Sequence, residues 1–506
     1  MVGNSFYVDG GFSVKAYRAL LVSGKQQGLL MGHSMLLSLL TSALATLVGV
    51  PLGVLLGKTD LPLRKTLAVI FTVPLLIPPY VMAAAWLAVL GTAGWVGRVL
   101  PAATADLLSS ALFGLYGCVW VLFAAFMPIV MLLTMTYLGA VNPRWEEAGR
   151  LASRWPAVLR RITLPLIAPA ILFAAILVFL LTLGEVGVPG FLRYPVYPVE
   201  TLTQFAAFYD FGAATAAAMP MLVVTLAILI LEYSFLHKRM LALRAMMPGR
   251  RQTQIELGSW RIPAFAIVLA WCIVTVLLPL AVLLAQASSL HAFSDALSRA
   301  SDSIGRSLAF AVVGATFLSV LGFFCGYLIA DRTLPLWRSV DALALFLFTL
   351  PGTVIGIGLI SLWNRPLTNV IYGTPAIIIL GYVAQYALLS MRITSVTLER
   401  IPRSLEQAAR LGGASWFMTL GEIVAPLAKR GLIAGWLICY VFCLRDLGIS
   451  TVVYPPGSDT LPIRILTLMA NGAPSLIAAL CVILIAVTLL PLGLAGLWLK
   501  RGMRNP

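Results

Sequence analysis

Two short segments of this chain carry charged residues in nearly the same order. The first is Trp145-Glu146-Glu147-Ala148-Gly149-Arg150-Leu151, and the second is Leu405-Glu406-Gln407-Ala408-Ala409-Arg410-Leu411. Each follows a long apolar run and is followed by a tryptophan, Trp155 or Trp416, and then by a proline, Pro165 or Pro426. Because Ala, Leu, Arg and Glu favour helix, each segment predicts a short helix at the membrane–water boundary. A charged helix repeated between apolar runs indicates a surface to which another protein binds.

No set of residues with catalytic or metal-binding chemistry accompanies these segments. The six cysteines lie in apolar stretches, where they are expected to pack as small apolar residues. Cys439 and Cys443 share a helix face, which leaves a soft metal site as the alternative, but the three histidines are far apart in sequence. The run from Gly53 to Thr59 resembles a phosphate loop but is one residue short and ends an apolar helix. We therefore expect no catalytic residue, no metal site and no ATP hydrolysis by this chain alone, with Lys58 as a positive anchor at the membrane surface.

Composition places these segments in a membrane protein. The chain of 506 residues is 60% hydrophobic and only 11% charged, which is typical of an all-α polytopic membrane protein. Apolar runs of about 20 residues or more, each long enough to cross the hydrocarbon core, predict about eleven spans. The predicted spans are 30–57, 66–91, 111–139, 166–188, 212–236, 262–285, 304–330, 339–363, 374–395, 427–449 and 474–499.

Loop charges set the orientation of these spans. Lys and Arg concentrate in alternate loops, which the positive-inside rule assigns to the cytoplasm. Both repeated segments and the C-terminus fall on that side. The net charge of +16 is explained in the same way, so no nucleic-acid partner is expected.

The two halves of the chain are related beyond the repeated segments. Corresponding pairs are Ser34 and Ser307, Gly49 and Gly322, Gly53 and Gly326, Leu61-Pro62 and Leu334-Pro335, Pro78 and Pro351, Trp155 and Trp416, Glu185 and Asp446, and Gly187 and Gly448. An even number of spans separates equivalent points, so the halves are expected to be parallel repeats. The predicted divisions are an extracytoplasmic segment 1–28, a first half 29–236, a cytoplasmic linker 237–261 and a second half 262–506. The second half has an extra leading span; either the first half lacks it or the chain starts before the residues given.

A few residues could line a path through the membrane. Pro78-Pro79 and Pro351-Gly352 break equivalent spans and free carbonyl groups that need new partners. Glu185 and the pair Arg445-Asp446 lie near the outer ends of two other equivalent spans, where ionisable groups often line water-filled routes. Packing kinks for the breaks, and an interfacial salt bridge for Arg445 and Asp446, are the open alternatives.

The repeated segment resembles the EAA signature of permeases in binding-protein-dependent ABC importers. That pattern is Glu-Ala-Ala, then a glycine, then Ile-x-Leu-Pro. The second copy has Gln407-Ala408-Ala409, Gly413 and Pro426; the first has Glu147-Ala148-Gly149 but Ser153 in place of the glycine. The resemblance implies a type I permease fold and a docking surface for ATPase subunits. Its candidate coupling residues are Glu146, Glu147, Ala148, Gly149, Arg150, Trp155, Glu406, Gln407, Ala408, Ala409, Arg410, Gly413 and Trp416.

Several outer segments are similar to ferric-iron permeases. These are Gly184–Pro189, Tyr209–Gly212, Leu444–Gly448 and Tyr454–Gly457 with Thr460–Arg464. The resemblance implies a multi-pass permease of the bacterial cytoplasmic (inner) membrane that imports ferric iron. Two copies of an ATPase, which hold ATP and magnesium, and an extracytoplasmic substrate-binding protein would be its partners, beside membrane lipid. Thiamine, phosphonate and polyamine permeases share this plan and remain alternatives, as does the separate class of ion-coupled secondary transporters.

Overall fold

The structure is a computed structural model that describes residues 7–8, 11–12, 24–91, 94–208, 211–245, 253–332 and 335–501. Within these residues the regular secondary structure is helical, apart from the hairpin of β1 (Tyr7–Val8) and β2 (Gly11–Phe12) and a parallel bridge between Thr59 and Ile255. The predicted all-α class is confirmed. Most of the segment 1–28, part of the linker, and Tyr209, Asp210 and Leu334 lie outside the described residues.

Helices of the first half begin with α3. Their bounds are α3 (Gly24–Lys58), α4 (Arg64–Leu76), α5 (Pro79–Leu90), α6 (Trp95–Val99), α7 (Ala102–Leu112), α8 (Leu115–Leu138), α9 (Pro143–Ala152), α10 (Trp155–Val158), η1 (Leu159–Thr163), α11 (Leu164–Leu183), α12 (Gly187–Phe191), α13 (Tyr197–Phe208) and α14 (Phe211–Ala245). Helix α14 continues to Ala245, past residue 237, where the sequence predicted the linker to begin.

The second half repeats this order after an extra leading unit. The leading unit is η2 (Gly258–Trp260), α15 (Arg261–Cys272), η3 (Ile273–Leu277) and α16 (Leu278–Gln286). The repeated part is α17 (Leu290–Asp331), α18 (Trp337–Thr349), α19 (Gly352–Trp363), α20 (Asn369–Tyr372), α21 (Ala376–Leu398), α22 (Arg403–Leu411), α23 (Trp416–Thr419), η4 (Leu420–Val424), α24 (Ala425–Arg445), α25 (Ser450–Val453), α26 (Leu461–Asn471) and α27 (Pro474–Arg501).

The number of spans agrees with the prediction. Ten helices in the described part of the chain are long and apolar enough to cross a membrane, or up to eleven if the bent pair α18–α19 counts as one span. Boundaries differ more. The predicted span 66–91 consists of α4 and α5, which meet at Pro78, and α17 begins at Leu290 rather than at residue 304. Helices α11 and α24 end at Leu183 and Arg445, not at residues 188 and 449.

The two spans after the repeated segments begin earlier than their prolines. Each candidate span starts at its tryptophan, Trp155 or Trp416, and runs on through a π-helical turn into α11 or α24. A proline inside a helix removes a hydrogen bond and clashes with the preceding turn. The wider π turn lies directly before each proline-containing turn, so the helix continues where the sequence predicted its start.

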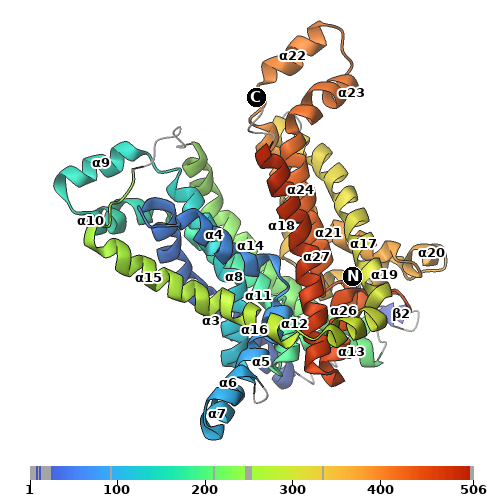
Figure 1. The fold of residues 1–506 in the computed structure, drawn as a ribbon. Coiled ribbons are helices and arrows are strands. Elements are labelled where there is room, and N and C mark those ends of the chain that lie inside the picture. Colours follow the sequence, from blue (N-terminus) through green and yellow to red (C-terminus); the bar gives the residue numbers. More distant parts are fainter. Residues whose placement is uncertain are drawn as a thin grey trace.

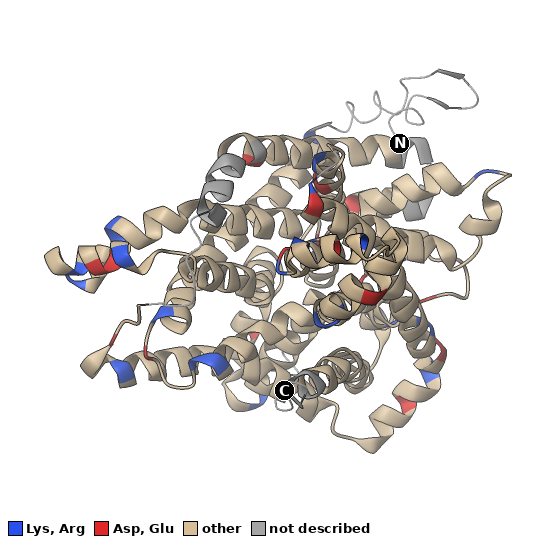
Figure 2. Ribbon diagram, turned by 90° about the horizontal axis from the view of Figure 1, so that it is seen from above, with Lys and Arg blue, Asp and Glu red and all other residues tan. Residues whose placement is uncertain are grey.

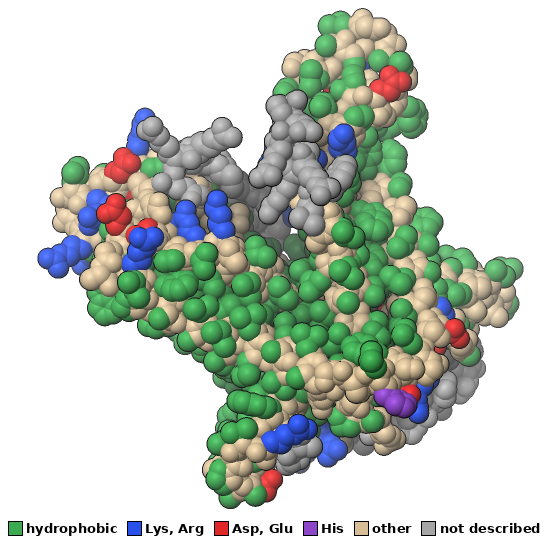
Figure 3. All heavy atoms as spheres, in the orientation of Figure 1, with side chains coloured by type: hydrophobic (Ala, Val, Ile, Leu, Met, Phe, Trp, Pro, Cys, Tyr) green, Lys and Arg blue, Asp and Glu red, His purple; other side chains and the backbone are tan. Residues whose placement is uncertain are grey.

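The molecule forms two arms that converge at one end (Figure 1). Helices α9 and α10 lie at the tip of one arm, and α22 and α23 at the tip of the other, both at the upper end of the view. Seen from above, Lys, Arg, Asp and Glu occupy a small part of the ribbon (Figure 2). Hydrophobic side chains cover much of the visible flank of both arms, and Lys and Arg gather at the tip of the α9 arm (Figure 3). This distribution fits a membrane-embedded body with water-exposed ends.

Small residues set the spacing between the long helices of each half. A Cβ added to Gly53 of α3 would come within 2.7 Å of Thr134 Cβ on α8, and one on Gly326 of α17 within 2.8 Å of Thr394 Cβ on α21. Such close backbone approach requires glycine at both positions. The predicted correspondence of Gly53 and Gly326 therefore reflects the same helix contact built twice.

The extra leading unit joins the two halves. Helix α16 packs against α5 of the first half and α27 of the second, and α14 of the first half packs against α18 and α19. One hydrophobic core accordingly extends through both halves, with smaller clusters beneath each repeated segment.

Candidate functional site

The repeated segments are short surface helices, α9 and α22, as predicted. Each ends in a leucine that lies almost free in solvent: Leu151 is 92% exposed and Leu411 is 91% exposed. Near the other end of each helix, Trp145 is 50% exposed and Leu405 is 43% exposed. Matching apolar side chains at matching positions, outside the spans, form two equivalent exposed apolar surfaces.

Most predicted coupling residues lie on these surfaces. Those exposed are Glu147, Ala148, Arg150, Gln407, Ala408 and Arg410, together with Gly413 and Trp416. Gly149 is partly buried, and a Cβ there would approach Ile162 Cδ1 to 2.6 Å. Packing against the turn below therefore accounts for glycine at a position where the signature has alanine.

Glu146, unlike most of the predicted coupling residues, is buried beneath α9. Its side chain is only 1% exposed and forms an ion pair with Lys58, the last residue of α3, which is 5% exposed. Thr163 Oγ1 donates to the same carboxylate oxygen at 2.8 Å, and Thr253 Oγ1 donates to the other at 2.5 Å. Lys58 is consequently a buried counter-ion rather than the surface anchor predicted from sequence. Glu146 fixes α9 to the body of the protein.

Glu406 occupies the equivalent position on α22 but has a simpler environment. Tyr327 of α17 donates its hydroxyl to Glu406 Oε2 at 2.6 Å, and both side chains are partly exposed. A pocket of about 330 Å³ opens beside them, lined by Tyr327, Ala330, Asp331, Arg332, Leu398, Glu399, Ile401, Arg403 and Glu406. At Glu406 the second surface helix thus receives one hydroxyl, Arg403 of the same helix bonds to the end of α17, and the helix borders a pocket.

The two surface segments also turn differently. Gly413 has φ +86°, the left-handed conformation that favours glycine, and α23 begins at Trp416. In the first half Ser153 is extended, with φ −152°, and α10 begins two residues later. The predicted glycine turn is therefore present in the second half, whereas the shorter first connection needs no glycine.

The two tryptophans differ in exposure. Trp416 is 41% exposed and makes edge-on contacts with Phe417 and Tyr327. Trp155 is partly buried, with the Arg150 guanidinium 5.2 Å above its ring. Trp416 therefore remains available as an apolar anchor, while Trp155 and Arg150 pack against each other.

The broken spans meet at the boundary between the halves. Pro78 and Pro351 have nearly identical extended conformations, with φ −57° and −56° and ψ 137° and 136°. The carbonyl of Leu75, before the first break, accepts a hydrogen bond from the Arg445 guanidinium at the end of α24. At the second break, a Cβ on Gly184, at the end of α11, would lie 3.0 Å from Pro351 Cα. Each break thus contacts the helix end of the opposite half.

One buried carboxylate, Asp446, and one partly buried carboxylate, Glu185, lie next to these contacts. Asp446 is 4% exposed; its oxygens accept hydrogen bonds from the Tyr386 hydroxyl at 2.8 Å and from the backbone and hydroxyl of Ser450 at 2.9 and 2.7 Å. Glu185 accepts from the amide of Gly187 at 3.1 Å. The sequence-predicted pore residues are brought together here, and the Arg445 side chain bonds to a freed carbonyl of the other half instead of reaching outward.

The end opposite the surface helices is built by a repeated polar contact. In the first half, His33 Nδ1 donates to Pro195 O at 3.0 Å, and the Tyr197 amide donates to Ser34 Oγ at 2.8 Å. These bonds attach the start of α13 to α3. The predicted correspondence of Ser34 extends to this contact, because Ser307 accepts from the Leu461 amide at 2.6 Å.

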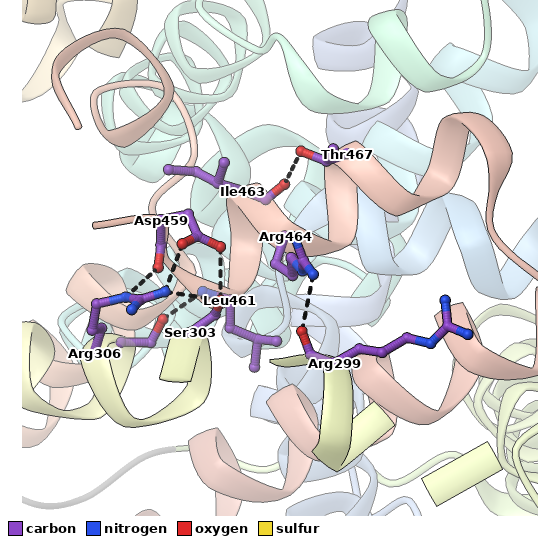
Figure 4. Close-up of polar contacts among 9 residues, drawn as sticks. Arg299, Ser303, Arg306, Asp459, Leu461, Ile463, Arg464 and Thr467 are labelled. Atoms are coloured by element: carbon purple, nitrogen blue, oxygen red, sulfur yellow. Dashed lines mark hydrogen bonds and ion pairs between the residues drawn. The ribbon is translucent and has the colours of Figure 1, made fainter. Parts of the chain in front are cut away.

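In the second half, the equivalent contact between the start of α26 and α17 also includes charged side chains (Figure 4). Arg306 donates to the carbonyl of Asp459 at 3.0 Å and pairs with its carboxylate at 2.6 Å, while Ser303 donates to the same carboxylate at 2.7 Å. Arg464 donates to the carbonyl of Arg299 at 3.0 Å. Helix α26 is thereby joined to α17 by charged contacts as well as by the amide–hydroxyl bond that the two halves share.

Sequence reasoning missed the residues that hold the surface helices in place. Lys58, Thr163 and Thr253 come from three separate stretches and converge only through folding. The sequence shows Lys58 only as a lysine at the end of a predicted span, where the positive-inside rule already explains its charge.

Comparison with known proteins agrees with this repeated architecture. The family described as "Binding-protein-dependent transport system inner membrane component" matches residues 49–241 and again residues 278–505. The chain is 26% identical over 412 residues to a putative ferric transport system permease, FbpB 1, of Haemophilus influenzae, covering 78% of this chain and 64% of that protein. It is 24% identical to the ferric transport system permease FbpB of Actinobacillus pleuropneumoniae, covering 76% of this chain and 58% of that protein.

Other relatives match over a smaller part of the chain. A putative 2-aminoethylphosphonate permease, PhnV, of Salmonella typhimurium is 25% identical over 43% of this chain and 87% of its own length. The spermidine/putrescine permease PotC of Escherichia coli is 26% identical over 36% of this chain and 68% of its own length. This chain spans less than two thirds of the length of either ferric relative. It belongs to the family of inner-membrane components of binding-protein-dependent transport systems, and it contains the family's domain twice.

Proposed function

We propose that this chain is the permease subunit of an ATP-driven importer whose two surface helices bind separate copies of an ATPase subunit. The observation that carries the proposal is the repetition of one exposed apolar pattern, Leu151 with Trp145 and Leu411 with Leu405, at one end of the molecule. Two equivalent surfaces suit two copies of one partner. ATP and magnesium would be held by that partner, and this end with the C-terminus would face the cytoplasm.

The same proposal assigns the translocation path to the boundary between the halves. The proline breaks and the nearby Glu185, Arg445 and Asp446 lie where movement of one arm against the other would change the packing. Closure of the ATPase pair would draw the surface helices together and move the arms, since rigid elements transmit such motion. The opposite end, including α13 and α26, would receive an extracytoplasmic substrate-binding protein.

Ferric iron is the substrate we propose. The two relatives that cover about three quarters of this chain are both ferric transport permeases, whereas the phosphonate and polyamine relatives match less than half of it. Among the residues described there is no group of three or more His, Cys, Asp or Glu side chains that could hold a metal ion. The binding protein would therefore select the iron, and the permease would admit it.

Charge reversal on both surface helices tests ATPase docking. Glu147 and Ala408 are exposed, so Glu147→Arg with Ala408→Arg is expected to leave membrane insertion intact and abolish association with the ATPase. Pull-down from detergent-solubilised membranes measures association, and Leu367→Ser, in the exposed connection between α19 and α20, is the control. Normal complex assembly by the double variant would refute the docking role.

Transport assays test the substrate and the energy source. Membranes containing the permease, its ATPase and its binding protein are expected to accumulate radiolabelled ferric iron, and not putrescine, 2-aminoethylphosphonate or thiamine. Uptake should stop on ATP depletion while a proton gradient persists. Uptake that follows the proton gradient instead would favour the secondary-transporter alternative.

A further inference from the structure

The linker between the halves is part of the first surface segment. Residues 253–257 run beside the end of α3 and form a short parallel bridge with it. The Ile255 amide donates to Lys58 O at 2.8 Å, and the Asp60 amide donates to Ile255 O at 3.1 Å. The Leu257 amide donates to Asp60 Oδ1 at 3.0 Å. Because the Ile255 side chain is also buried, this segment is docked rather than merely adjacent.

From this position the linker reaches the carboxylate beneath α9. Thr253 Oγ1 donates to one oxygen of Glu146 at 2.5 Å, while Lys58 and Thr163 occupy the other. Hydrogen bonds to a charged acceptor are shorter and stronger than neutral ones. Glu146 therefore ties three separate elements, α3, η1 and the linker, to the helix on which it lies.

Among the described residues of the second half, the end of α17 forms no backbone bridge like the one between Thr59 and Ile255. The pocket beside α22 lies among the residues that correspond to those covered by the linker in the first half. The carbonyl of Asp331, at the end of α17, accepts from the Arg403 guanidinium at 2.8 Å, as the carbonyl of Lys58 accepts from the Ile255 amide. A side chain of α22 itself thus takes over one bond, and the rest of the space stays open.

We propose that residues 253–257 position the first surface helix for coupling, with Thr253, Lys58 and Thr163 as the positioning residues that act through Glu146. The linker would then do more than connect the halves, because its docking sets the orientation of α9 toward the ATPase. This inference rests on the proposed coupling function, but the position of α9 can be measured without it.

Thr253→Val is the deciding variant. Valine keeps the shape of threonine and removes the hydroxyl donor, while Lys58 and Thr163 remain to balance Glu146, so the protein is expected to fold. Amide hydrogen exchange in α9 should become faster by about tenfold, the effect of losing one charge-assisted hydrogen bond. Exchange in α22 should not change. In proteoliposomes with the ATPase and binding protein, the amount of ferric iron imported per ATP hydrolysed should fall, with normal assembly.

Controls separate this inference from the proposed function. Thr203→Val removes a hydroxyl that bonds only within its own helix at Val199, and it should alter neither measurement. Unchanged exchange in α9 of Thr253→Val would overturn the positioning role, whether or not an ATPase binds. Faster exchange in α9 with a normal ratio of import to hydrolysis would show a merely structural contact and also reject it. Failure of the wild-type permease to bind an ATPase would refute the proposed function while leaving the exchange result readable.

Discussion

The two surface helices present nearly the same face to a partner but are attached to the protein in different ways. Leu151 and Leu411 are almost equally exposed at equivalent positions. Beneath them, Glu146 is buried in an ion pair with hydrogen bonds from two threonines, whereas Glu406 receives one hydroxyl from Tyr327 beside a pocket. The exposed residues of α9 and α22 are thus repeated, whereas the contacts of Glu146 and Glu406 beneath them differ.

This difference suits two separate requirements of a permease with both halves in one chain: the exposed surfaces for a partner, and the contacts that attach those surfaces to the protein. The two copies of an ATPase subunit that we propose as partner would require two similar faces, and the exposed residues of α9 and α22 fit that requirement. The contacts that attach each helix to the protein need not be alike. Those of α9 include the linker between the halves, which exists because both halves are in one chain. The contrast predicts that the first surface helix, α9, moves less relative to the body of the protein than the second surface helix, α22.

The largest expected effect comes from removing the buried counter-ion of the first support. Lys58→Met leaves Glu146 without its positive partner, and losing one member of a buried ion pair costs about 3–5 kcal/mol of stability. Thermal unfolding of the purified permease, followed by the exposure of its buried cysteines to a thiol dye, measures the loss. Lys58→Met combined with Glu146→Gln should recover much of it, because no unpaired charge is then buried. An unaltered unfolding temperature in the single variant would contradict the buried pair.

Next in size is the contribution of the two matched leucines to ATPase binding. Burying a leucine side chain at an interface contributes about 1.5–3 kcal/mol, so Leu151→Ser and Leu411→Ser should each weaken association about 10- to 100-fold. Surface-bound ATPase titrated with each variant in detergent gives the two affinities. Equal losses of affinity would show that the two leucines contribute equally to the free energy of binding. A loss confined to one leucine would break the comparison, because the two faces would then not be equivalent.

A smaller effect is expected where the two connections differ. Gly413 lies in the left-handed region, so Gly413→Ala should cost about 1–2 kcal/mol, whereas Ser153→Ala in the extended first connection should cost little. Hydrogen exchange in the residues that follow each turn reports the difference. Similar costs at both positions would mean that the second turn is not held in its left-handed form.

Local chemistry made part of this structure predictable from sequence. Prolines at 78 and 351 break their spans as predicted, because a missing N–H and a fixed φ act wherever a proline occurs. The surface helices α9 and α22 follow from helix propensity, and the turn at Gly413 follows from the freedom of glycine. The family also follows from these repeated local features.

Long-range contacts account for what the sequence did not reveal. Which of Glu146 and Glu147 is buried depends on the positions of Lys58 and Thr253, and neither is near in sequence. Two spans were predicted to start at residues 166 and 427, but each begins earlier, at Trp155 or Trp416, and continues through a π turn that precedes its proline. The contact of Arg445 with Leu75 joins opposite halves, so no local pattern contains it.

The smallest effect, and the sharpest test of unequal supports, is expected at Tyr327. Tyr327→Phe removes the hydroxyl that Glu406 accepts, and the carboxylate can then be solvated from the neighbouring pocket. Because water replaces the lost partner, the cost should be about 0.5–1.5 kcal/mol, well below that of Lys58→Met. The same thermal unfolding assay, run on both variants, compares the two supports directly. If Tyr327→Phe destabilised the permease as much as Lys58→Met, the second helix would be held as firmly as the first, and the mechanical difference between the halves would disappear.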